Sequence, residues 1–159
     1  MANERWEAFL AANPRGQFQQ SWRWAEVKVA EGWQGVLETW PAGAEELAGG
    51  FLMLIKATRL GRVGFVNKGP VLREETVVEL AKALAAIQRV AREQHLRAVI
   101  LQLPDGSQIA PELLWRKGFG KSPVAGVLDA TLILDVRRQV SFADITSSAF
   151  TDLKAIDGQ

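Results

Sequence analysis

The sequence predicts an α/β (α+β) layer fold, with a central mixed sheet flanked by helices. Apolar residues recur at helical spacing over 74–94, a continuous apolar run of strand length lies at 51–55, and a mainly apolar stretch of strand length lies at 97–103. Strands that alternate with helices in this way are typical of a layered sheet. With 159 residues, of which 48% are hydrophobic and 23% charged, the chain is long enough to form one ordinary globular domain with a core.

The first third of the chain is predicted to be helical. Asn3 is a suitable N-cap for a short amphipathic helix ending at Ala11, and the turn residues at 13–16 follow it. A second helix is expected after Ser21, because a serine hydroxyl accepts hydrogen bonds from the free N–H groups of a first helical turn. Gly32 is expected to close this helix as a C′ residue.

Strands come next. Residues 34–39 alternate weakly as a strand, and the stretch PAGAEELAGG (41–50) is predicted to be a connection. The run FLMLI (51–55) has no polar residue, which favours a strand buried on both faces. A further short strand is expected at 63–66.

The long helix is predicted to span 74–94, with its apolar face built from residues that follow the 3.6 period. His95 lies at its end, where a cation suits the helix dipole, and is interpreted as a surface or capping histidine. Beyond it, we expect a buried strand at 97–103, a short helix at 112–117 and a strand at 129–136.

Composition excludes several kinds of site. The chain has no cysteine and one histidine, which rules out disulfides, thiolate catalysis and multi-histidine metal centres, so no metal is predicted. With a net charge of +1, the chain has no strong overall positive field that would attract nucleic acid. The N-terminus has no apolar core of a signal peptide, and no apolar run is long enough for a transmembrane span, so a cytoplasmic location is expected.

Two stretches are candidate binding sites. Lys28 falls one helical turn after Trp24, so its cation either grips an anion beside the indole or simply extends to water past core tryptophans. Asn67, Lys68, Gly69 and Pro70 form a rigid turn after a strand, which is either a ligand loop or a plain connection.

No catalytic residue can be identified, because the chain offers no pair of nucleophile and base. Asp105, Asp129 and Asp135 are candidates for an acid or base only because they lie at predicted strand ends.

The order of elements resembles that of the GNAT acyltransferases, and Lys117-Gly118-Phe119 is similar to a "KxGF" phrase of that family. GNAT enzymes usually grip acetyl-CoA with a glycine-rich loop that opens the long helix. Here that helix is predicted to open on VLREETVVEL, which has the adjacent carboxylates Glu74 and Glu75 and no glycine. Acetyl-CoA is therefore not the expected cofactor, and none is predicted.

A second resemblance is more specific. FQQSWRWAEVKVAEGW (18–33), VGFVNKGPVL (63–72) and LWRKGFGKSP followed by ATLILDV (114–136) resemble, in the same order, phrases of the FemAB family of peptidoglycan aminoacyltransferases. That resemblance implies two GNAT-like domains. It also implies transfer of an amino acid from aminoacyl-tRNA, as co-substrate, to the peptide stem of a peptidoglycan precursor, without a metal.

By the same resemblance, Lys28 is expected to bind the phosphates of the nucleotide-sugar precursor, and Lys68 is the second candidate for phosphate binding. Gln20, Ser21 and Trp24 match the motif around Lys28 and are expected to support its helix. In the loop, a lysine replaces the family's arginine, which keeps the charge and loses bidentate recognition.

The expected organisation is a GNAT-like N-terminal domain of the Fem type at 1–136, with 137–159 as a tail or the start of a second domain. The expected partners are UDP-MurNAc-pentapeptide or a lipid-linked peptidoglycan precursor, aminoacyl-tRNA, and a second GNAT-like domain or another copy of the chain. Two alternatives remain open: a GNAT-like binding or assembly domain without catalysis, and an acetyl-CoA-dependent N-acetyltransferase.

Overall fold

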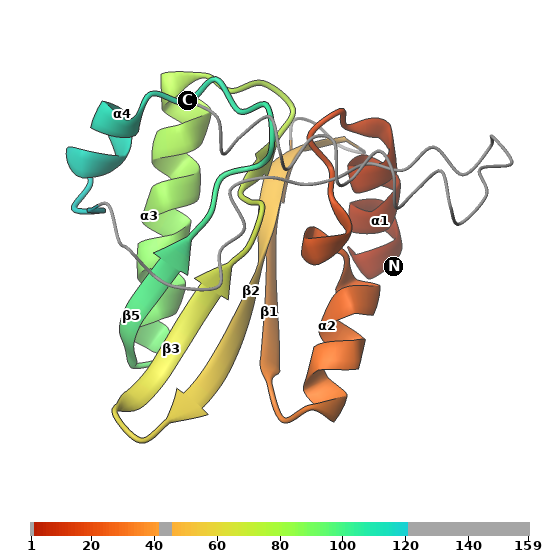
Figure 1. Ribbon diagram of the computed structural model, residues 1–159. Coiled ribbons are helices and arrows are strands. Elements are labelled where there is room, and N and C mark those ends of the chain that lie inside the picture. Colours follow the sequence, from red (N-terminus) through yellow and green to blue (C-terminus); the bar gives the residue numbers. More distant parts are fainter. Residues whose placement is uncertain (1, 42–45, 121–159) are drawn as a thin grey trace, which may run out of the picture. The chain divides into compact units, whose positions relative to one another are not determined.

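A computed structural model describes residues 2–41 and 46–120. A five-stranded mixed sheet lies at its centre, with helices on both faces (Figure 1). In chain order, the elements are α1 (Ala2–Ala12), the 3₁₀ helix η1 (Phe18–Gln20), α2 (Trp22–Ala30), β1 (Gln34–Pro41), β2 (Leu47–Thr58), β3 (Gly61–Val66), β4 (Val71–Leu72), α3 (Val77–Glu93), β5 (Leu96–Leu101) and α4 (Pro111–Trp115). The predicted fold class, a mixed sheet flanked by helices, is confirmed.

The sheet is organised around the twelve-residue strand β2. The strand order is β1-β2-β3-β5, with β4 also paired to β2. All pairs are antiparallel except β3 with β5, which is parallel. On the edge facing away from β1, β2 pairs first with β4, up to Gly50, and then with β3, from Leu54 onward. Between these two ladders, residues 51–53 have no strand partner on that edge within the described part of the chain.

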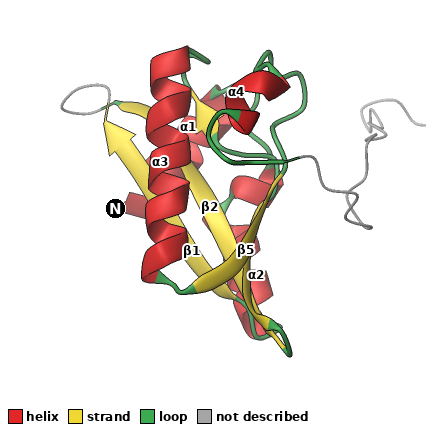
Figure 2. Cartoon of the chain, turned by 90° about the vertical axis from the view of Figure 1, so that its left-hand side faces the viewer, coloured by secondary structure: helices red, strands yellow, loops and turns green. Residues whose placement is uncertain are grey.

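Helices bury β2 on both faces, which confirms the prediction made from its apolar run. α3 covers one face, and α1 and α2 cover the other over β1 and β2 (Figures 1 and 2). The core under α3 includes Phe51, Met53, Ile55, Leu80, Leu84, Ile87 and Val90. The core under α1 and α2 includes Trp6, Leu10, Leu47, Val71, Ala25, Leu52 and Leu54.

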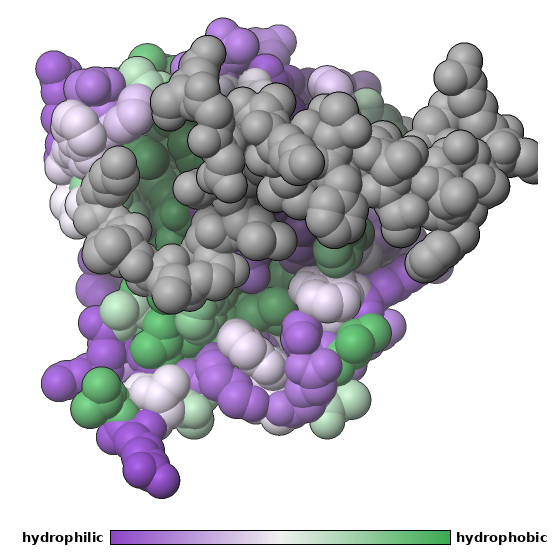
Figure 3. Space-filling view, viewed as in Figure 1, coloured by the Kyte–Doolittle hydropathy of each residue, from purple (hydrophilic) through white to green (hydrophobic). Residues whose placement is uncertain are grey.

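On the α2 side of the sheet, β3 and β5 present half-buried apolar residues. Phe65 contacts Trp33 edge-to-face at 5.4 Å between ring centroids, and Ile100 is the β5 partner of Phe65. Figure 3 shows apolar residues in green on the face of the molecule that this view presents. Strand β5 was predicted to be buried, but Arg97 and Ala98 are exposed, because β5 has a strand partner on one edge alone among the described residues.

Several predicted boundaries were wrong. The long helix begins at Val77 rather than at 74, because the hydroxyl of Thr76 accepts from the backbone N–H of Glu79 at 3.1 Å and caps the helix there. Helix α1 already includes Asn3, which is therefore not its cap. The last part of the predicted connection at 41–50 belongs to β2 from Leu47 onward.

Other local predictions were confirmed. Ser21 caps α2 by accepting from the N–H of Arg23, and Gly32 ends that helix with φ +79°. The short helix α4 has Pro111 in its first turn and Gly118, with φ +85°, after its end. The predicted strand at 129–136 and the domain boundary at 136 lie outside the described residues. No helix among the described residues combines the length and apolarity needed to cross a bilayer.

Candidate functional site

Lys28 lies on the last turn of α2, where two groups hold its ammonium. Its Nζ is 4.8 Å from the centroid of the Trp24 ring and 2.7 Å from Oε2 of Glu31. The side chain of Lys28 is 22% exposed, whereas that of Glu31 is 53% exposed. Trp24 itself packs against the core under α2 and makes an edge contact with Phe18. The cation therefore lies partly buried against an indole face, and its reduced exposure to water strengthens its interaction with an anion.

Gln20 is the buried polar residue at the centre of the α1–α2 layer, with 0% exposure. Its Oε1 accepts from the N–H of Leu52 at 2.7 Å, and its Nε2 donates to the carbonyls of Leu52 at 3.3 Å and Asn67 at 2.6 Å. The indole N–H of Trp6 donates to the backbone carbonyl of Gln20 at 2.7 Å. The side-chain amide of Gln20 thus fills the gap between the two ladders of β2 and ties it to the end of β3.

The loop after β3 approaches this amide closely. A Cβ on Gly69 would lie 2.7 Å from the side chain of Gln20, so only a glycine fits there without a shift. The backbone N–H of Gly69 donates to the carbonyl of Gln102 at 2.9 Å, and the Gly69–Pro70 peptide bond is cis. The motif residues Asn67, Gly69 and Pro70 therefore connect β3, β5 and Gln20. Gln20 was expected to support α2; its side-chain amide bonds to Leu52 and Asn67, and support of the helix stays a prediction.

Lys68 is 8% exposed at its side chain, has φ +53°, and its Nζ contacts Oδ1 of Asp105. The other carboxylate oxygen of Asp105 accepts from Nε2 of Gln17 at 2.9 Å. Hydrogen bonds from Lys68 and Gln17 lower the pKa of the Asp105 carboxyl below its usual range. The Asp105 side chain is 49% exposed. An ionised carboxylate, held by a buried lysine, therefore faces solvent at the carboxyl ends of β3 and β5.

The structure does not bring Lys28 and Lys68 together. The C-terminal end of α2 lies near the start of β3, because Lys56, which pairs with Val63, donates from Nζ to the carbonyl of Glu31 at 2.8 Å. Lys68 follows the other end of β3. Val63 and Val66 are roughly 10 Å apart at the rise of an extended strand, so the two cations occupy opposite ends of β3. Phosphate binding by either lysine remains a prediction.

The remaining predicted residues have these positions. Ser21 donates from Oγ to both carboxylate oxygens of Glu7, at 2.9 and 3.0 Å, and Glu7 also accepts from the N–H of Trp22 at 2.7 Å. His95 is exposed with φ +52°, and its N–H donates to the carbonyl of Arg92, as expected of a capping residue. Asp129 and Asp135 lie outside the described residues.

Sequence reasoning missed Glu7 and Gln17 entirely. Glu7 lies on a different helix from the N-terminus that it caps, and the partner of Gln17 is 88 positions away along the chain. No local signal indicates such contacts.

A metal site and a surface hollow were considered as further candidate sites. In the described ranges, no group of three or more His, Cys, Asp or Glu side chains could hold a metal ion. A hollow of about 350 Å³ lies between α1 and α2, but its three glutamates disfavour an anionic ligand. It is lined by Asn3, Glu4, Glu7, Trp22, Arg23 and Glu26.

Comparisons with known proteins identify the family and the fold of the chain. A family model described as the FemAB family matches residues 1–108, which is more than half of the chain. The crystal structure of FemX is similar, with a TM-score of 0.62 and 20% identity over 74% of this chain and 29% of FemX. The crystal structure of a probable acetyltransferase has a TM-score of 0.50 and 18% identity, over 71% of this chain and 76% of that protein. No curated protein matched.

These likenesses confirm the GNAT-like fold. The family match includes the phrases at 18–33 and 63–72, which contain Lys28 and Lys68, and stops before the phrase at 114–136. The chain spans less than a third of the length of FemX.

Proposed function

The chain belongs to the FemAB family, and on that premise we propose that it is the N-terminal GNAT-like part of a tRNA-dependent aminoacyltransferase. Its acceptor would be the peptide stem of a peptidoglycan precursor, UDP-linked or lipid-linked, and its donor an aminoacyl-tRNA. The family resemblance implies a second GNAT-like domain, which would complete the site either within one protein or through another chain. A cytoplasmic location, where both substrates are made, follows from this proposal.

The single observation that carries the proposal is the position of Lys28. Its ammonium lies on the indole of Trp24, and Glu31 is the carboxylate that pairs with it. Because Glu31 is half exposed, it can move aside without loss of a buried contact, and such surface pairs contribute at most about 1 kcal/mol. A diphosphate can therefore replace Glu31 on Lys28. A compact ammonium is suited to this role because it can serve several phosphate oxygens.

In this proposal Lys68 acts through Asp105 and does not bind phosphate. Aminoacyl transfer breaks the ester to tRNA and forms an amide on the acceptor amine, which gives up a proton. A carboxylate with a lowered pKa is a weak base, so Asp105 is better suited to hold an ammonium group of a substrate than to remove that proton. Lys68 holds this carboxylate in place, and its predicted contact with phosphate would require it to leave Asp105. The catalytic base remains unassigned.

The test is calorimetric titration of the purified chain with UDP-MurNAc-pentapeptide. We expect Lys28→Ala to weaken binding at least tenfold, a loss of about 1.4 kcal/mol. Lys82→Ala is the matched control, because Lys82 also pairs with a glutamate at i, i+3 but lies on α3, and it should leave binding unchanged. Equal binding by wild type and Lys28→Ala would remove Lys28 from the site. A folded wild-type chain that does not bind the precursor would refute the claim that this part binds it alone.

An acetyl-CoA-dependent N-acetyltransferase is the second candidate, and the likeness to a probable acetyltransferase over 76% of that protein favours it. The N-terminus of α3 argues against acetyl-CoA. Its N-cap is a threonine, and the carboxylate of Glu79 in the first turn would repel a pyrophosphate bound there. A parallel titration with acetyl-CoA decides between the aminoacyltransferase and the N-acetyltransferase, and we expect acetyl-CoA not to bind. Gel filtration tests the remaining alternative, a GNAT-like binding or assembly domain without catalysis. A stable dimer would favour such a domain, paired with another copy of the chain.

A further inference from the structure

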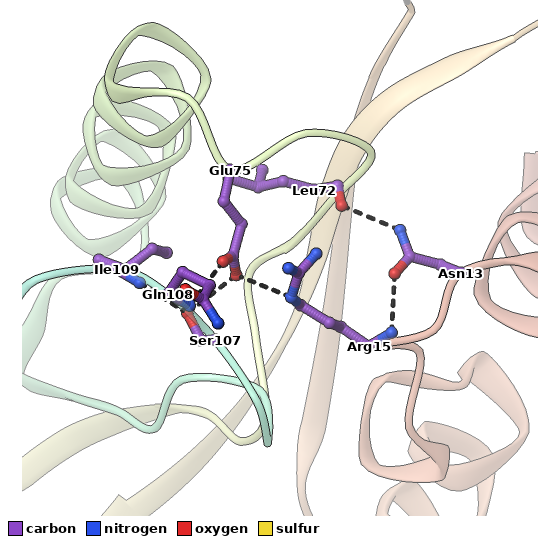
Figure 4. Close-up of polar contacts among 7 residues, drawn as sticks. All are labelled: Asn13, Arg15, Leu72, Glu75, Ser107, Gln108 and Ile109. Atoms are coloured by element: carbon purple, nitrogen blue, oxygen red, sulfur yellow. Dashed lines mark hydrogen bonds and ion pairs between the residues drawn. The ribbon is translucent and has the colours of Figure 1, made fainter.

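Glu75 lies in the loop that joins β4 to α3, and its carboxylate is nearly enclosed, with 6% of the side chain exposed. It accepts from two neutral donors of the loop after β5. Ser107 Oγ donates to Oε1 and the backbone N–H of Gln108 donates to Oε2, each at 2.8 Å (Figure 4). Arg15 is the one described cation within 4 Å, with its Nε 3.4 Å from Oε1. The shorter contacts show that this carboxylate mainly holds a loop.

The loop that Glu75 holds contains Asp105. Pro104 to Ser107 form one tight turn, closed by a hydrogen bond from the Ser107 N–H to the Pro104 carbonyl at 3.2 Å. Gly106, with φ +70°, occupies the third position of that turn, where a positive φ is required. Because Asp105 and Ser107 belong to the same four-residue turn, anchoring Ser107 also fixes the direction in which the Asp105 side chain points.

The N-terminal segment contacts the 72–75 loop through Asn13 and the 104–108 turn through Gln17. Asn13 donates from Nδ2 to the carbonyl of Leu72 at 2.9 Å and accepts from the Arg15 N–H at 2.9 Å (Figure 4). Gln17, two residues later, donates to Asp105. Segments 13–17, 72–75 and 104–108 therefore meet at one place, and Glu75 is the residue that links all three.

We propose that Glu75 is a positioning residue that holds the 104–108 turn so that Asp105 lies against Lys68 and Gln17. Glu75 itself touches no substrate. The inference rests on the proposed function in one respect, since the position of Asp105 matters for the precursor only if Asp105 belongs to that site. The geometric claim, that Glu75 controls where Asp105 lies, can be tested without any substrate.

The sign of the Asp105 pKa change separates positioning from simple charge repulsion. Replacing Glu75 with glutamine removes a nearby negative charge, which by itself lowers the pKa of Asp105 further. Loosening the turn has the opposite effect, because the hydrogen bonds from Lys68 and Gln17 that lower this pKa would be made only part of the time. Glu75→Asp keeps the charge but is one methylene shorter, so it cannot keep both loop contacts and tests loosening alone.

The experiment follows the carboxyl carbon of Asp105 by NMR across a pH titration of the full chain. We expect the pKa of Asp105 to rise toward its ordinary range in Glu75→Gln and Glu75→Asp. Lys68→Met marks the end point for complete loss of the lysine contact. Glu74→Gln, an exposed neighbour, is the matched control and should not raise it. Amide exchange at Gln108 should also become at least about tenfold faster in Glu75→Gln, because its N–H loses a charged acceptor.

A fall in the Asp105 pKa in Glu75→Gln, or no change in Glu75→Asp, would overturn the proposal. If a Glu75 variant fails to fold, Ser107→Ala removes only the hydroxyl contact to Glu75 and must raise the pKa of Asp105 as well. Failure of the proposed function gives a different result: the wild-type chain would not bind UDP-MurNAc-pentapeptide, and the pKa of Asp105 would still depend on Glu75.

Discussion

The side chain of Gln20 should be one of the largest single contributors to stability, and Gln20→Leu tests this with little change in shape. The substitution removes three hydrogen bonds and leaves the N–H of Leu52 and the carbonyl of Asn67, which make the two short contacts, without their partner. A buried polar group without a partner costs about 1–3 kcal/mol. Two such groups predict a loss of about 2–6 kcal/mol, which is a large fraction of the stability of a domain this size.

Urea denaturation followed by tryptophan fluorescence measures this loss. Gln19→Leu is the matched control, because Oε1 of Gln19 is buried without a hydrogen-bond partner. Its removal should leave the free energy of unfolding unchanged or raise it. Gln20→Glu adds a further check, since a carboxylate has no N–H to donate to the two carbonyls, and part of the loss should return at low pH where the carboxyl is protonated. A loss below about 1 kcal/mol in Gln20→Leu would refute the role of this amide.

Two further predictions concern local features. Hydrogen bonds from Lys82 and Trp40 lower the pKa of Glu79, so Glu79 stabilises the fold above its ordinary pKa, and this contribution is lost as pH falls from that value through the lower folded one. Urea midpoints between neutral and acidic pH should therefore fall less steeply in Glu79→Gln than in wild type, and an unchanged profile would contradict this. Gly106→Ala should cost about 1–2 kcal/mol because an L-residue is strained at φ +70°. Gly106→Asn should cost less, and equal stability of the alanine variant would refute the requirement.

The features that the sequence predicted correctly depend on neighbours in the chain. The cap at Ser21, the helix end at Gly32 and the two-sided burial of 51–55 follow from local patterns and were found. The start of α3 was misplaced because Glu74 and Glu75 suit a helix N-terminus electrostatically, yet the hydroxyl of Thr76 caps the helix two residues later.

The missed features involve partners far apart in the sequence. Gln20 was matched to a motif, but nothing near it indicates that its amide bonds to Leu52 and Asn67. Lys68 and Asp105 were both noticed, separately, as loop residues. Their pairing depends on β3 and β5 being parallel neighbours, which places the loops after them at the same edge of the sheet. Periodicity and capping signals carry no information about which strands pair.

The separation of Lys28 and Lys68 along β3 sets a minimum length for a ligand. A molecule that reaches both Lys28 and the Lys68–Asp105 pair has to extend from one end of β3 to the other, a backbone span of about 10 Å, for which a free diphosphate is too short and a nucleotide-sugar joined to a peptide is long enough. Shortening such a ligand should therefore reveal two independent halves. UDP alone should respond to Lys28→Ala and not to Lys68→Met, whereas only the full-length conjugate should respond to both.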